Sequence, residues 1–508
     1  MKRNQRILKP LCAAVLTTAL LTACGAKEEA KTGSAAAEDK SAAPLPISLV
    51  VQQVGEVPGK DSPIQQAMEK YTNTKLDFQW IPSAAFDDKI NVMVASGELP
   101  KAMRLKWNAS TLNSTRDGLF HEIGPLLKDY PNLSALNQMY YDNVKVDGKI
   151  YGLPLYRDIG RAGIVFRKDW MDKLGLKVPV TLDDWYNVSK EIATKDPDGN
   201  KQNDTYALFL DKSFTGPGSA NTMTRLAVSQ GAPNKWGMIN GKMTPDFMTK
   251  EYMDTLKLFR KLYAEKLINQ DFSVAQTTDN DNKWNNGKLG LRIAVASTAE
   301  GYNDLVKKST PSAVTDVAPM TGPKGILLPG EPGNNGLYVF PKSSVKTEAE
   351  LKRILKFFDQ LLDAPMANLL ARGIEGTHYE KADGGKVKWK DLTAFQKDVK
   401  PYRDMLPSFE VGGKASPLQN PELTDKMWKI VDENLKYSVP NPALTLNSPT
   451  YTEKGAELDN MMIDSQTKYV MGKIDDAAWQ AEVDKWMKAG GSKVIDEYTA
   501  EYNKLNKK

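Results

Sequence analysis

The sequence predicts two large lobes of the α/β class, the first with a largely parallel sheet and the second rich in helices. The chain has 508 residues, of which 41% are apolar and 26% charged. This composition is globular, and the length is sufficient for more than one core. Short apolar strands and helices alternate near the N-terminus, and from Lys168 onward longer helices follow with few strands between them.

The first lobe is expected to begin with alternating strands and helices. Residues 47–54 (ISLVVQQV) are short and β-branched, as in a strand. A helix is expected over 61–73, where Asp61 or Ser62 can cap it and Pro63 suits the first turn. Residues 75–81 alternate apolar and polar like a second strand, and a helix over 87–96 follows. This order indicates a largely parallel sheet.

Longer helices characterise the second half of the chain. We expect them at residues 182–195, 249–267, 347–363, 422–436 and 476–488. Trp170, Trp185 and Trp428 lie at helical spacing, which favours burial in a core. The chain contains no internal repeat and no transmembrane run after residue 24.

The N-terminus has the pattern of an export signal. Residues 1–9 are basic and residues 11–22 are apolar or small. A helix of this apolar length reaches about 18 Å, well short of the roughly 30 Å of a bilayer core. The run ends in Leu-Thr-Ala-Cys, which resembles the bacterial lipobox, where cleavage precedes a cysteine that carries diacylglycerol. Residues 1–23 are then a signal peptide, Cys24 is the lipid attachment site, and 24–46 form a flexible tether. A plain secretory peptide is the alternative.

Charge and cysteine content exclude several classes of function. The formal net charge is +5, but four basic residues lie in the first nine positions, so the remainder carries 64 basic and 63 acidic residues. Such a neutral body lacks the basic excess of a nucleic-acid-binding protein. The two cysteines, Cys12 and Cys24, both lie in the signal region. The body therefore has no disulfide scaffold, cysteine-type zinc site, iron–sulfur cluster or cysteine nucleophile.

An acidic loop provides a candidate metal site. Side-chain oxygens recur at loop positions 1, 3, 5 and 9, and position 7 can offer a backbone carbonyl, much as in the first part of an EF-hand. The glycine stands at position 4 instead of 6, and position 12 is Ala207 instead of glutamate. An Asx/Gly turn is the alternative. The interpretation we test is a structural Ca²⁺ site formed by Asp196, Asp198, Asn200, Gln202 and Asp204.

Aromatic residues beside loop signals indicate a ligand-binding cleft. Sugars offer flat C–H faces and rows of hydroxyls, so their sites combine aromatic platforms with polar edges. Trp107, Trp236 and Trp284 each precede asparagine or glycine. Trp107 and Tyr156 follow expected strands, at the sheet edge where α/β proteins bind ligands. Burial in a core is the alternative for any single tryptophan.

Signals of an enzyme are weak. The chain has no G-x-S-x-G, Walker, G-x-G-x-x-G or kinase motif. His121 and His378 cannot form a three-histidine metal site. Adjacent acids such as Asp183-Asp184 could suggest glycan cleavage, but acids at a helix start are usually caps. A surface glycan hydrolase or lyase and a purely structural or adhesive lipoprotein remain alternatives.

Seven segments together carry a resemblance to a known family: 95–100 (ASGELP), 146–154 (VDGKIYGLP), 166–176 (FRKDWMDKLGL), 196–204, 286–290 (NGKLG), 322–325 (GPKG) and 490–498. In this order along the chain, they resemble the family 1 extracellular solute-binding lipoproteins of ABC importers, in the oligosaccharide-binding branch of Gram-positive bacteria. The chain departs from the usual family pattern at Lys101, which often is aspartate, and at Thr205, where related calcium loops often place an acid.

The resemblance implies a two-lobed, periplasmic-binding-protein-like fold of type II, with a hinge of crossing strands. Crossings are expected near 155–165 and 312–320, with a return around 340–346. The first lobe would comprise 47–157 and 316–345, and the second 158–315 and 346–508.

The resemblance also implies that a carbohydrate is caught between the lobes and delivered to membrane permease subunits. The protein would be a non-enzymatic monomer, lipid-anchored on the extracytoplasmic face of the membrane. Arg157 or Arg161 would lie near the hinge and could hold hydroxyls or a uronate carboxylate, whereas an inter-lobe salt bridge is the alternative. The candidate ligand-binding residues are Trp107, Asn108, Tyr156, Arg157, Arg161, Trp284 and Tyr338.

Overall fold

The computed structural model describes residues 43–53, 55–408 and 414–506. The predicted signal peptide, Cys24 and most of the expected tether lie outside these residues. In the described part of the chain, no helix has the length and apolarity needed to cross a bilayer.

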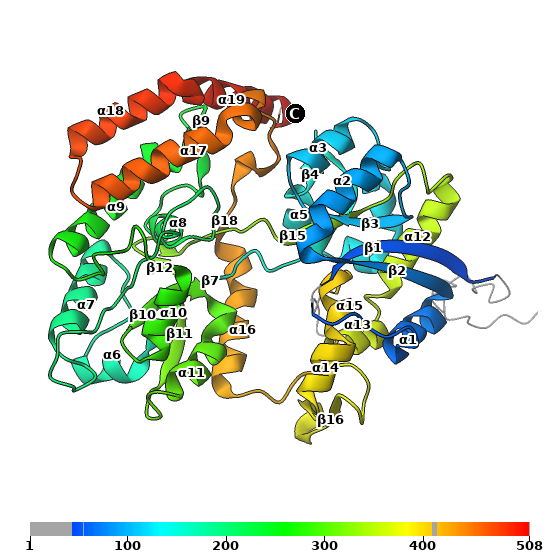
Figure 1. Ribbon diagram of the computed structural model, residues 1–508, viewed down its shortest axis with the longest axis horizontal. Coiled ribbons are helices and arrows are strands. Elements are labelled where there is room, and N and C mark those ends of the chain that lie inside the picture. The colour runs from blue at the N-terminus through cyan, green and yellow to red at the C-terminus, as the bar shows by residue number, and fades with distance from the viewer. Residues whose placement is uncertain (1–42, 54, 409–413, 507–508) are drawn as a thin grey trace, which may run out of the picture. The chain divides into compact units, whose positions relative to one another are not determined.

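The first lobe is built on a five-stranded mixed sheet (Figure 1). β1 is parallel to β2 and β3, whereas β15 is antiparallel to both β3 and β6. The expected first two strands and the parallel pairing near the N-terminus are therefore confirmed, but the sheet is mixed and not largely parallel, because the pairings of β15 are antiparallel. The strands run in the order β2 (Thr74–Pro82), β1 (Leu45–Gln53), β3 (Ala102–Leu105), β15 (Asn334–Val339) and β6 (Gly152–Tyr156).

Both faces of this sheet are buried. Successive side chains of a strand point to opposite faces, so Leu49 and Val51 of β1 lie in one apolar cluster and Val50 lies in another. The helix α1 (Pro63–Thr72) covers the first face, and its N-terminus is capped by the Ser62 side chain, as expected. The helix α2 (Phe86–Ser96) covers the second face.

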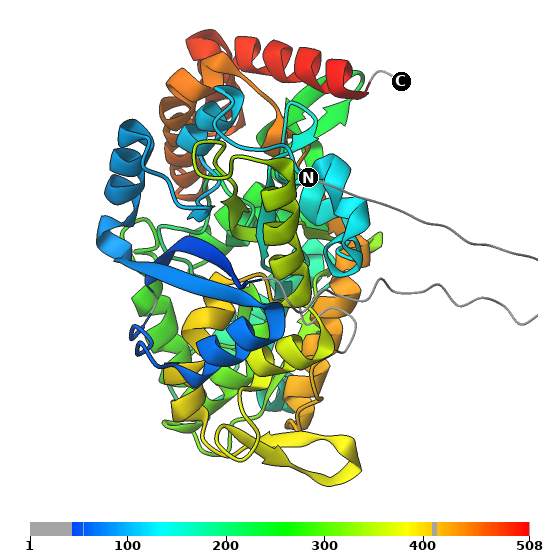
Figure 2. The ribbon, with the colours of Figure 1, turned by 90° about the vertical axis from the view of Figure 1, so that its right-hand side faces the viewer.

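The first lobe also contains a long segment that the sequence prediction assigned to the second lobe. Residues 346–406 were expected to follow the chain into the second lobe, but their helices cover the sheet of the first (Figure 2). Leu351, Ile354 and Phe358 of α12 pack in the same cluster as Leu49 of β1. The helices involved are α12 (Glu348–Gln360), α13 (Ala364–Arg372), α14 (Leu392–Asp398) and α15 (Lys400–Met405).

The second lobe contains a three-stranded antiparallel sheet surrounded by helices. Its central strand β7 (Ala162–Arg167) pairs with β10 (Leu291–Val295) and with β11 (Thr315–Pro319). Residues 315–319 thus belong to this lobe, so the expected boundary at residue 316 is wrong. The crossing occurs later, at 330–333, between β14 (Leu328–Pro329) and β15. β14 pairs with β18 (Ser438–Val439).

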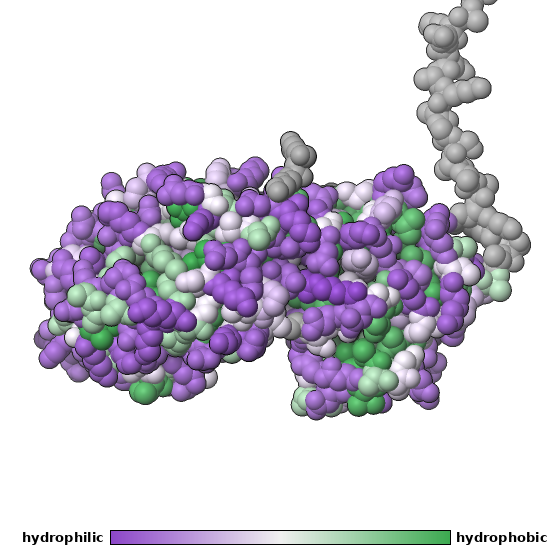
Figure 3. Space-filling model, turned by 90° about the horizontal axis from the view of Figure 1, so that it is seen from above, coloured by the Kyte–Doolittle hydropathy of each residue, from purple (hydrophilic) through white to green (hydrophobic). Residues whose placement is uncertain are grey.

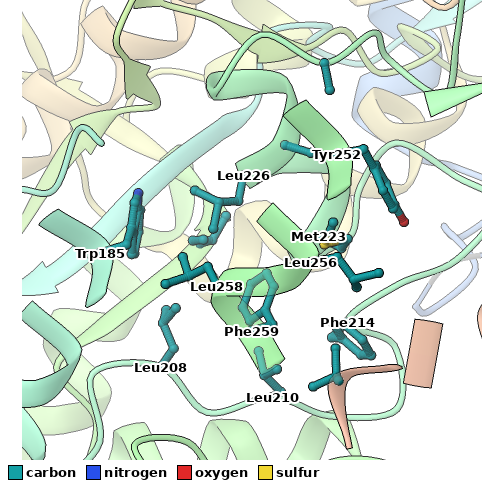
Figure 4. Packing of buried hydrophobic residues seen from close by; sticks show 14 of the residues in the cluster. Trp185, Leu208, Leu210, Phe214, Met223, Leu226, Tyr252, Leu256, Leu258 and Phe259 are labelled. Carbon is teal, nitrogen blue, oxygen red and sulfur yellow. The ribbon is translucent and has the colours of Figure 1, made fainter. Parts of the chain in front are cut away.

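Helices cover both faces of this second sheet, as the helix-rich prediction requires. One cluster joins Ile164 and Phe166 of β7 to Trp185, Leu226 and Phe259 (Figure 4). Another cluster joins Val165 of β7 to helices on the opposite face. The helices of the first cluster include α6 (Lys168–Leu174), α7 (Leu182–Thr194), α8 (Thr222–Ser229), α9 (Lys250–Ala264), α17 (Pro449–Val470), α18 (Asp476–Trp486) and α19 (Ser492–Asn506), and those of the second are α10 (Thr277–Asn285), α11 (Ala299–Lys307) and α16 (Glu422–Asn434).

The expected tryptophan burial is confirmed at two of the three positions. Trp170 and Trp185 are 2% and 1% exposed, but Trp428 of α16 is 43% exposed. The buried face of α16 is formed by Met427, Ile430 and Val431. Trp428 is the neighbour of Met427 but lies outside this buried face. The expected helix bounds in this half of the chain agree with α7, α9, α16 and α18 to within a few residues at each end.

The chain crosses between the lobes at 157–161, between β6 and β7, and again at 330–333, between β14 and β15. A buried charge cluster holds these two crossing segments together. Glu331 on the later segment accepts a bond from Arg161 (Nη1 to Oε2, 3.1 Å) and another from Arg225 of α8 (Nη2 to Oε1, 2.9 Å). Asn434 of α16 donates to the carbonyls of Gly160 and Ala162 at 3.0 Å each. A Cβ at Gly160 would lie 2.7 Å from the backbone of Asn434, so this close approach requires glycine.

Removal of the Glu331 carboxylate is expected to destabilise the protein strongly. Glu331→Ala leaves Arg225 buried without its carboxylate partner, and such a loss costs about 3–5 kcal/mol of unfolding free energy. Urea unfolding followed by tryptophan fluorescence measures this loss. The matched control is Glu380→Ala, which removes an exposed carboxylate paired with Lys388 and should change the midpoint far less. Equal midpoints for the two variants would contradict the role of Glu331.

Candidate ligand-binding cleft

A cavity of about 420 Å³ is lined by residues of both lobes. This size lies in the range of small-molecule sites, roughly 300–1,000 Å³. The first lobe contributes Trp107, Asn108, Leu112, Asn113 and Arg116. The second lobe contributes the loop at Gly216, the hairpin of β8 (Trp236–Ile239) and β9 (Lys242–Pro245), the segment 441–448, and α17 with neighbours from α18 and α19.

The first-lobe residues are positioned by the end of a strand and the start of a helix. Trp107 and Asn108 follow β3 after one intervening residue, at the strand's carboxyl end, where α/β sheets commonly bind ligands. The Asn108 side chain accepts a bond from the Thr111 amide at 3.0 Å and so caps α3 (Ala109–Arg116). Both residues line the cavity, as the sequence analysis expected.

Aromatic side chains form much of the second-lobe wall. The Trp236 ring meets Tyr498 edge-on at 5.0 Å, and Phe247 meets Trp486 in the same way at 5.0 Å. Trp486 and Tyr498 are only 3% and 4% exposed, so they support the wall from behind. Trp107 and Trp236 are half-buried and therefore offer ring surface to a ligand from opposite lobes.

The charged groups at the cavity are already paired. The Lys235 ammonium lies 3.3 Å from the carboxylate of Asp246 and donates to the carbonyl of Gly216 at 2.9 Å. Arg116 of the first lobe lies 3.3 Å from Asp147. Burial raises the pKa of Asp246, although the neighbouring Lys235 opposes this shift. Lys235 and Arg116 are the cations among the described residues that line the cavity, and each already has a carboxylate partner.

A second carboxyl group lies on α17. Asp459 accepts a hydrogen bond from the Tyr451 hydroxyl at 2.7 Å, and both residues line the cavity. Burial raises the pKa of Asp459, and the Tyr451 bond and Lys235 oppose the shift only in part. Asp246 and Asp459 both line the cavity beside aromatic rings, and their carboxyl oxygens can accept hydrogen bonds. This combination suits a ligand with many hydroxyl groups.

Two of the predicted ligand-binding residues lie in cores instead. Trp284 is completely buried, and its indole nitrogen donates to the carbonyl of Tyr302 at 2.9 Å. Tyr338 of β15 is also fully buried, and its hydroxyl donates to the carbonyl of Met405. Both predictions are wrong, because a buried ring with its polar atom satisfied inside the protein has nothing to offer a ligand.

The remaining candidates lie at the crossing and not among the residues that line the cavity. Tyr156 stacks on Tyr140 at 4.9 Å, and its hydroxyl donates to Asp158 at 2.8 Å. Arg157 is exposed and lies near Arg161, and its amide donates to the carbonyl of Gly333 at 3.1 Å. Arg161 pairs with Glu331, which is the salt bridge that the sequence analysis held as the alternative.

The candidate ligand-binding residues chosen from the sequence include none of the second-lobe wall, although Trp236 was noted beside a loop signal. Trp236 precedes Gly237, and this loop signal was visible in the sequence. Lys235, Asp246 and Asp459 carry no such signal. They meet only because the β8–β9 hairpin packs on α17 and α19, more than 200 residues later in the chain.

In the acidic loop, two of the carboxylates predicted to bind calcium face a lysine side chain. The ammonium of Lys288 lies 2.7 Å from Asp198 and 2.8 Å from Asp204. Among the residues that the structure describes, no group of three or more acidic, histidine or cysteine side chains is arranged to hold a metal ion. Asp198 and Asp204, two of the three carboxylates expected to bind a cation, are thus paired with a side chain of the protein itself.

Two α/β lobes, chain crossings between them and a cavity lined from both sides define a two-lobed ligand-binding protein. Residues 55–367 match the family described as bacterial extracellular solute-binding protein. The chain belongs to this family, whose members bind solutes and are not enzymes.

Two relatives from Bacillus subtilis (strain 168) and one solved structure support this assignment. Lipoprotein LipO is 35% identical over 98% of this chain and 99% of its own. The polygalacturonan/rhamnogalacturonan-binding protein YtcQ is 35% identical over 94% of this chain and 95% of its own. The HMO-binding, ABC-transporter-associated solute-binding protein of Bifidobacterium longum infantis ATCC 15697 has a TM-score of 0.69 at 18% identity, covering 92% of this chain and 100% of that one. The last comparison supports the fold.

The raised pKa of Asp459 predicts how stability depends on pH. The folded-state pKa exceeds the ordinary value of 3.8, so the contribution of Asp459 is complete below 3.8 and is lost as the pH rises through the raised value. Asp459→Asn keeps an acceptor for Tyr451 but cannot ionise. We expect its stability relative to the unmodified protein to rise between pH 4 and pH 7, as measured by urea unfolding.

The matched control for this variant is Asp464→Asn, on the same helix. Asp464 is 62% exposed and pairs with Lys468, so its variant should show a smaller pH dependence. A stability difference for Asp459→Asn that stays flat or falls over this pH range would contradict the shift.

Proposed function

We propose that this protein captures an oligosaccharide in the cavity between its lobes and delivers it to the permease of an ABC importer. The observation that carries the proposal is the composition of the cavity wall. Trp107 and Trp236 offer ring surface from opposite lobes, and Asp246 and Asp459 provide hydroxyl acceptors beside the aromatic wall. The name of YtcQ, a relative that aligns along nearly the whole chain, supports a carbohydrate ligand.

Pairing of the cavity charges favours neutral sugars. Lys235 and Arg116 already have the carboxylate partners Asp246 and Asp147, and Asp459 adds a further negative group. A uronate would bring its own charge to a wall without a free cation, and burial of an unpaired charge is costly. Oligogalacturonides are the second candidate ligands, because the name of YtcQ includes polygalacturonan.

Ligand binding is tested by thermal shift with matched panels of neutral and uronate oligosaccharides. A ligand present at 100 times its Kd adds about 2.7 kcal/mol to the free energy of unfolding. We expect stabilisation by at least one neutral oligosaccharide and little by oligogalacturonides. Stabilisation by uronates alone would shift the assignment to acidic sugars, and no stabilisation by any member would contradict carbohydrate capture.

Loss of the Trp107 ring is expected to weaken sugar binding. Trp107→Ala removes one of the two stacking surfaces, and an aromatic contact contributes about 0.5–1.5 kcal/mol beyond its buried area. We expect about a tenfold increase in Kd, measured by calorimetry with the best oligosaccharide of the panel. The matched control is Trp428→Ala, which removes an exposed ring of α16 that does not line the cavity. Equal affinities for the two variants would argue against Trp107 as a platform.

We further propose that the protein is anchored to the outer face of the membrane through a lipid on Cys24. The basic start, the short apolar run and the Leu-Thr-Ala-Cys sequence support this proposal, as does the name of lipoprotein LipO. The family's extracellular placement agrees with it. Such an anchor would keep the captured sugar near its permease.

Substitution of Cys24 tests the anchor. Cys24→Ala should abolish incorporation of labelled palmitate and release the protein from the membrane fraction, because the thiol at the predicted lipobox is removed. Cys12→Ala is the matched control, since it changes the other cysteine of the signal region and should leave the protein labelled and bound. A Cys24→Ala protein that stays labelled would contradict the proposed attachment site.

A further inference from the structure

The acidic loop is organised around lysine side chains. Lys288 donates to Asp198 Oδ2 at 2.7 Å and to Asp204 Oδ1 at 3.0 Å, and its Nζ lies 2.8 Å from Asp204 Oδ2. The Lys288 and Asp198 side chains are 25% and 17% exposed, so this ion pair is largely shielded from water. The Lys288 ammonium group therefore connects the carboxylates of Asp198 and Asp204.

The other oxygens expected to bind a cation are already used within the loop. Both carboxylate oxygens of Asp196 accept backbone amides, from Asn200 at 3.0 Å and from Lys201 at 2.9 Å. The side-chain oxygen of Asn200 accepts the Gln202 amide at 2.7 Å. Asp198 Oδ1 alone is buried without a hydrogen-bond partner among the described residues. Calcium needs about six to eight oxygens, which is more than the single unpartnered side-chain oxygen that the loop buries.

Positions later in the loop face away from it. Thr205, where related loops often carry an acid, is 2% exposed, and its hydroxyl donates to the carbonyl of Ile192 at 2.7 Å. Ala207, at the twelfth position, is fully buried in the core of the second lobe. Neither position can supply the bidentate carboxylate that completes an EF-hand site.

A second lysine contributes to the same loop. Lys173 of α6 donates to the backbone carbonyl of Pro197 at 2.8 Å. The ammonium groups of Lys173 and Lys288 together carry two positive charges, which is the charge of one divalent cation. They reach the loop from different elements, before and after it in the sequence.

The backbone holds Lys288 at this position. Gly287 has a φ of +68°, and this left-handed residue ends the turn after α10. The amide of Tyr206 then donates to the carbonyl of Lys288 at 3.0 Å, and the amide of Gly290 donates to the carbonyl of Tyr206 at 2.8 Å. Lys288 is therefore fixed beside the end of the acidic loop by main-chain hydrogen bonds.

We propose that the Lys288 ammonium takes the place of a divalent cation in the loop 196–204, so that the fold of this lobe does not require calcium. Lys288 neutralises Asp198 and Asp204 and connects the loop to the start of β10. The inference concerns the stability of the lobe and is independent of which ligand the cavity binds.

The first test compares the unmodified protein with and without calcium. We expect the melting temperature in 5 mM EGTA to equal that in 5 mM CaCl₂ to within about 1 °C, because the carboxylates already have a cation. The purified protein should contain much less than one calcium per chain by elemental analysis. A clear fall of the melting temperature on chelation, or one calcium retained per chain, would overturn the proposal.

The second test removes the ammonium group. Lys288→Met keeps the length of the side chain but leaves Asp198 and Asp204 without their cation, so we expect the melting temperature in EGTA to fall by several degrees. The matched control is Lys201→Met in the same loop, whose lysine is exposed and makes no ion pair among the described residues. Equal melting temperatures for both variants would overturn the proposal. If Lys288→Met does not fold, the first test still decides between lysine and calcium.

Discussion

The buried carboxylate of Glu331 is the interaction on which the two-lobed arrangement depends. It lies on one crossing segment and binds Arg161 on another, while Arg225 ties both to the second lobe. A buried charge is costly unless it is paired, so this cluster is stable only when all three side chains are in place. The crossing segments therefore have a defined position relative to α8. The helix α8 packs in the same core as α17, α18 and α19, which contribute to the second-lobe wall of the cavity.

The cavity follows from this arrangement because each lobe supplies only part of it. Trp107 and Asn108 depend on where β3 ends, whereas Trp236 and Asp459 depend on how the β8–β9 hairpin packs against α17. Neither half encloses a ligand alone. The face seen in Figure 3 is mostly hydrophilic, with an apolar patch on the right-hand lobe.

Local signals in the sequence were sufficient to predict individual helices and strands, but not which helices, strands or side chains they contact. The capping residues and apolar periodicity predicted α1, α7 and α16 to within a few residues. The periodicity of α12 reveals an apolar stripe but not which sheet the stripe covers, and for this reason residues 346–406 were assigned to the wrong lobe. Trp284 beside asparagines had the pattern of a cleft residue, yet a single sequence cannot show that its ring points inward. Lys288 meets Asp198 across 90 residues, a contact that no local pattern predicts.

The discontinuous first lobe has a consequence for the order of folding during synthesis. Its sheet begins at Leu45, but the fourth strand in the sheet is β15 and the covering helix α15 ends at Met405. The ribosome must therefore produce the whole middle of the chain before the first core can close. Non-local pairing of this kind slows folding, and a nascent chain that stays unfolded longer is easier to pass through a secretion channel. The second lobe, for its part, waits for helices α17 to α19 at the very end. The two lobes are thus expected to mature late and in close succession, rather than one after the other as the chain emerges.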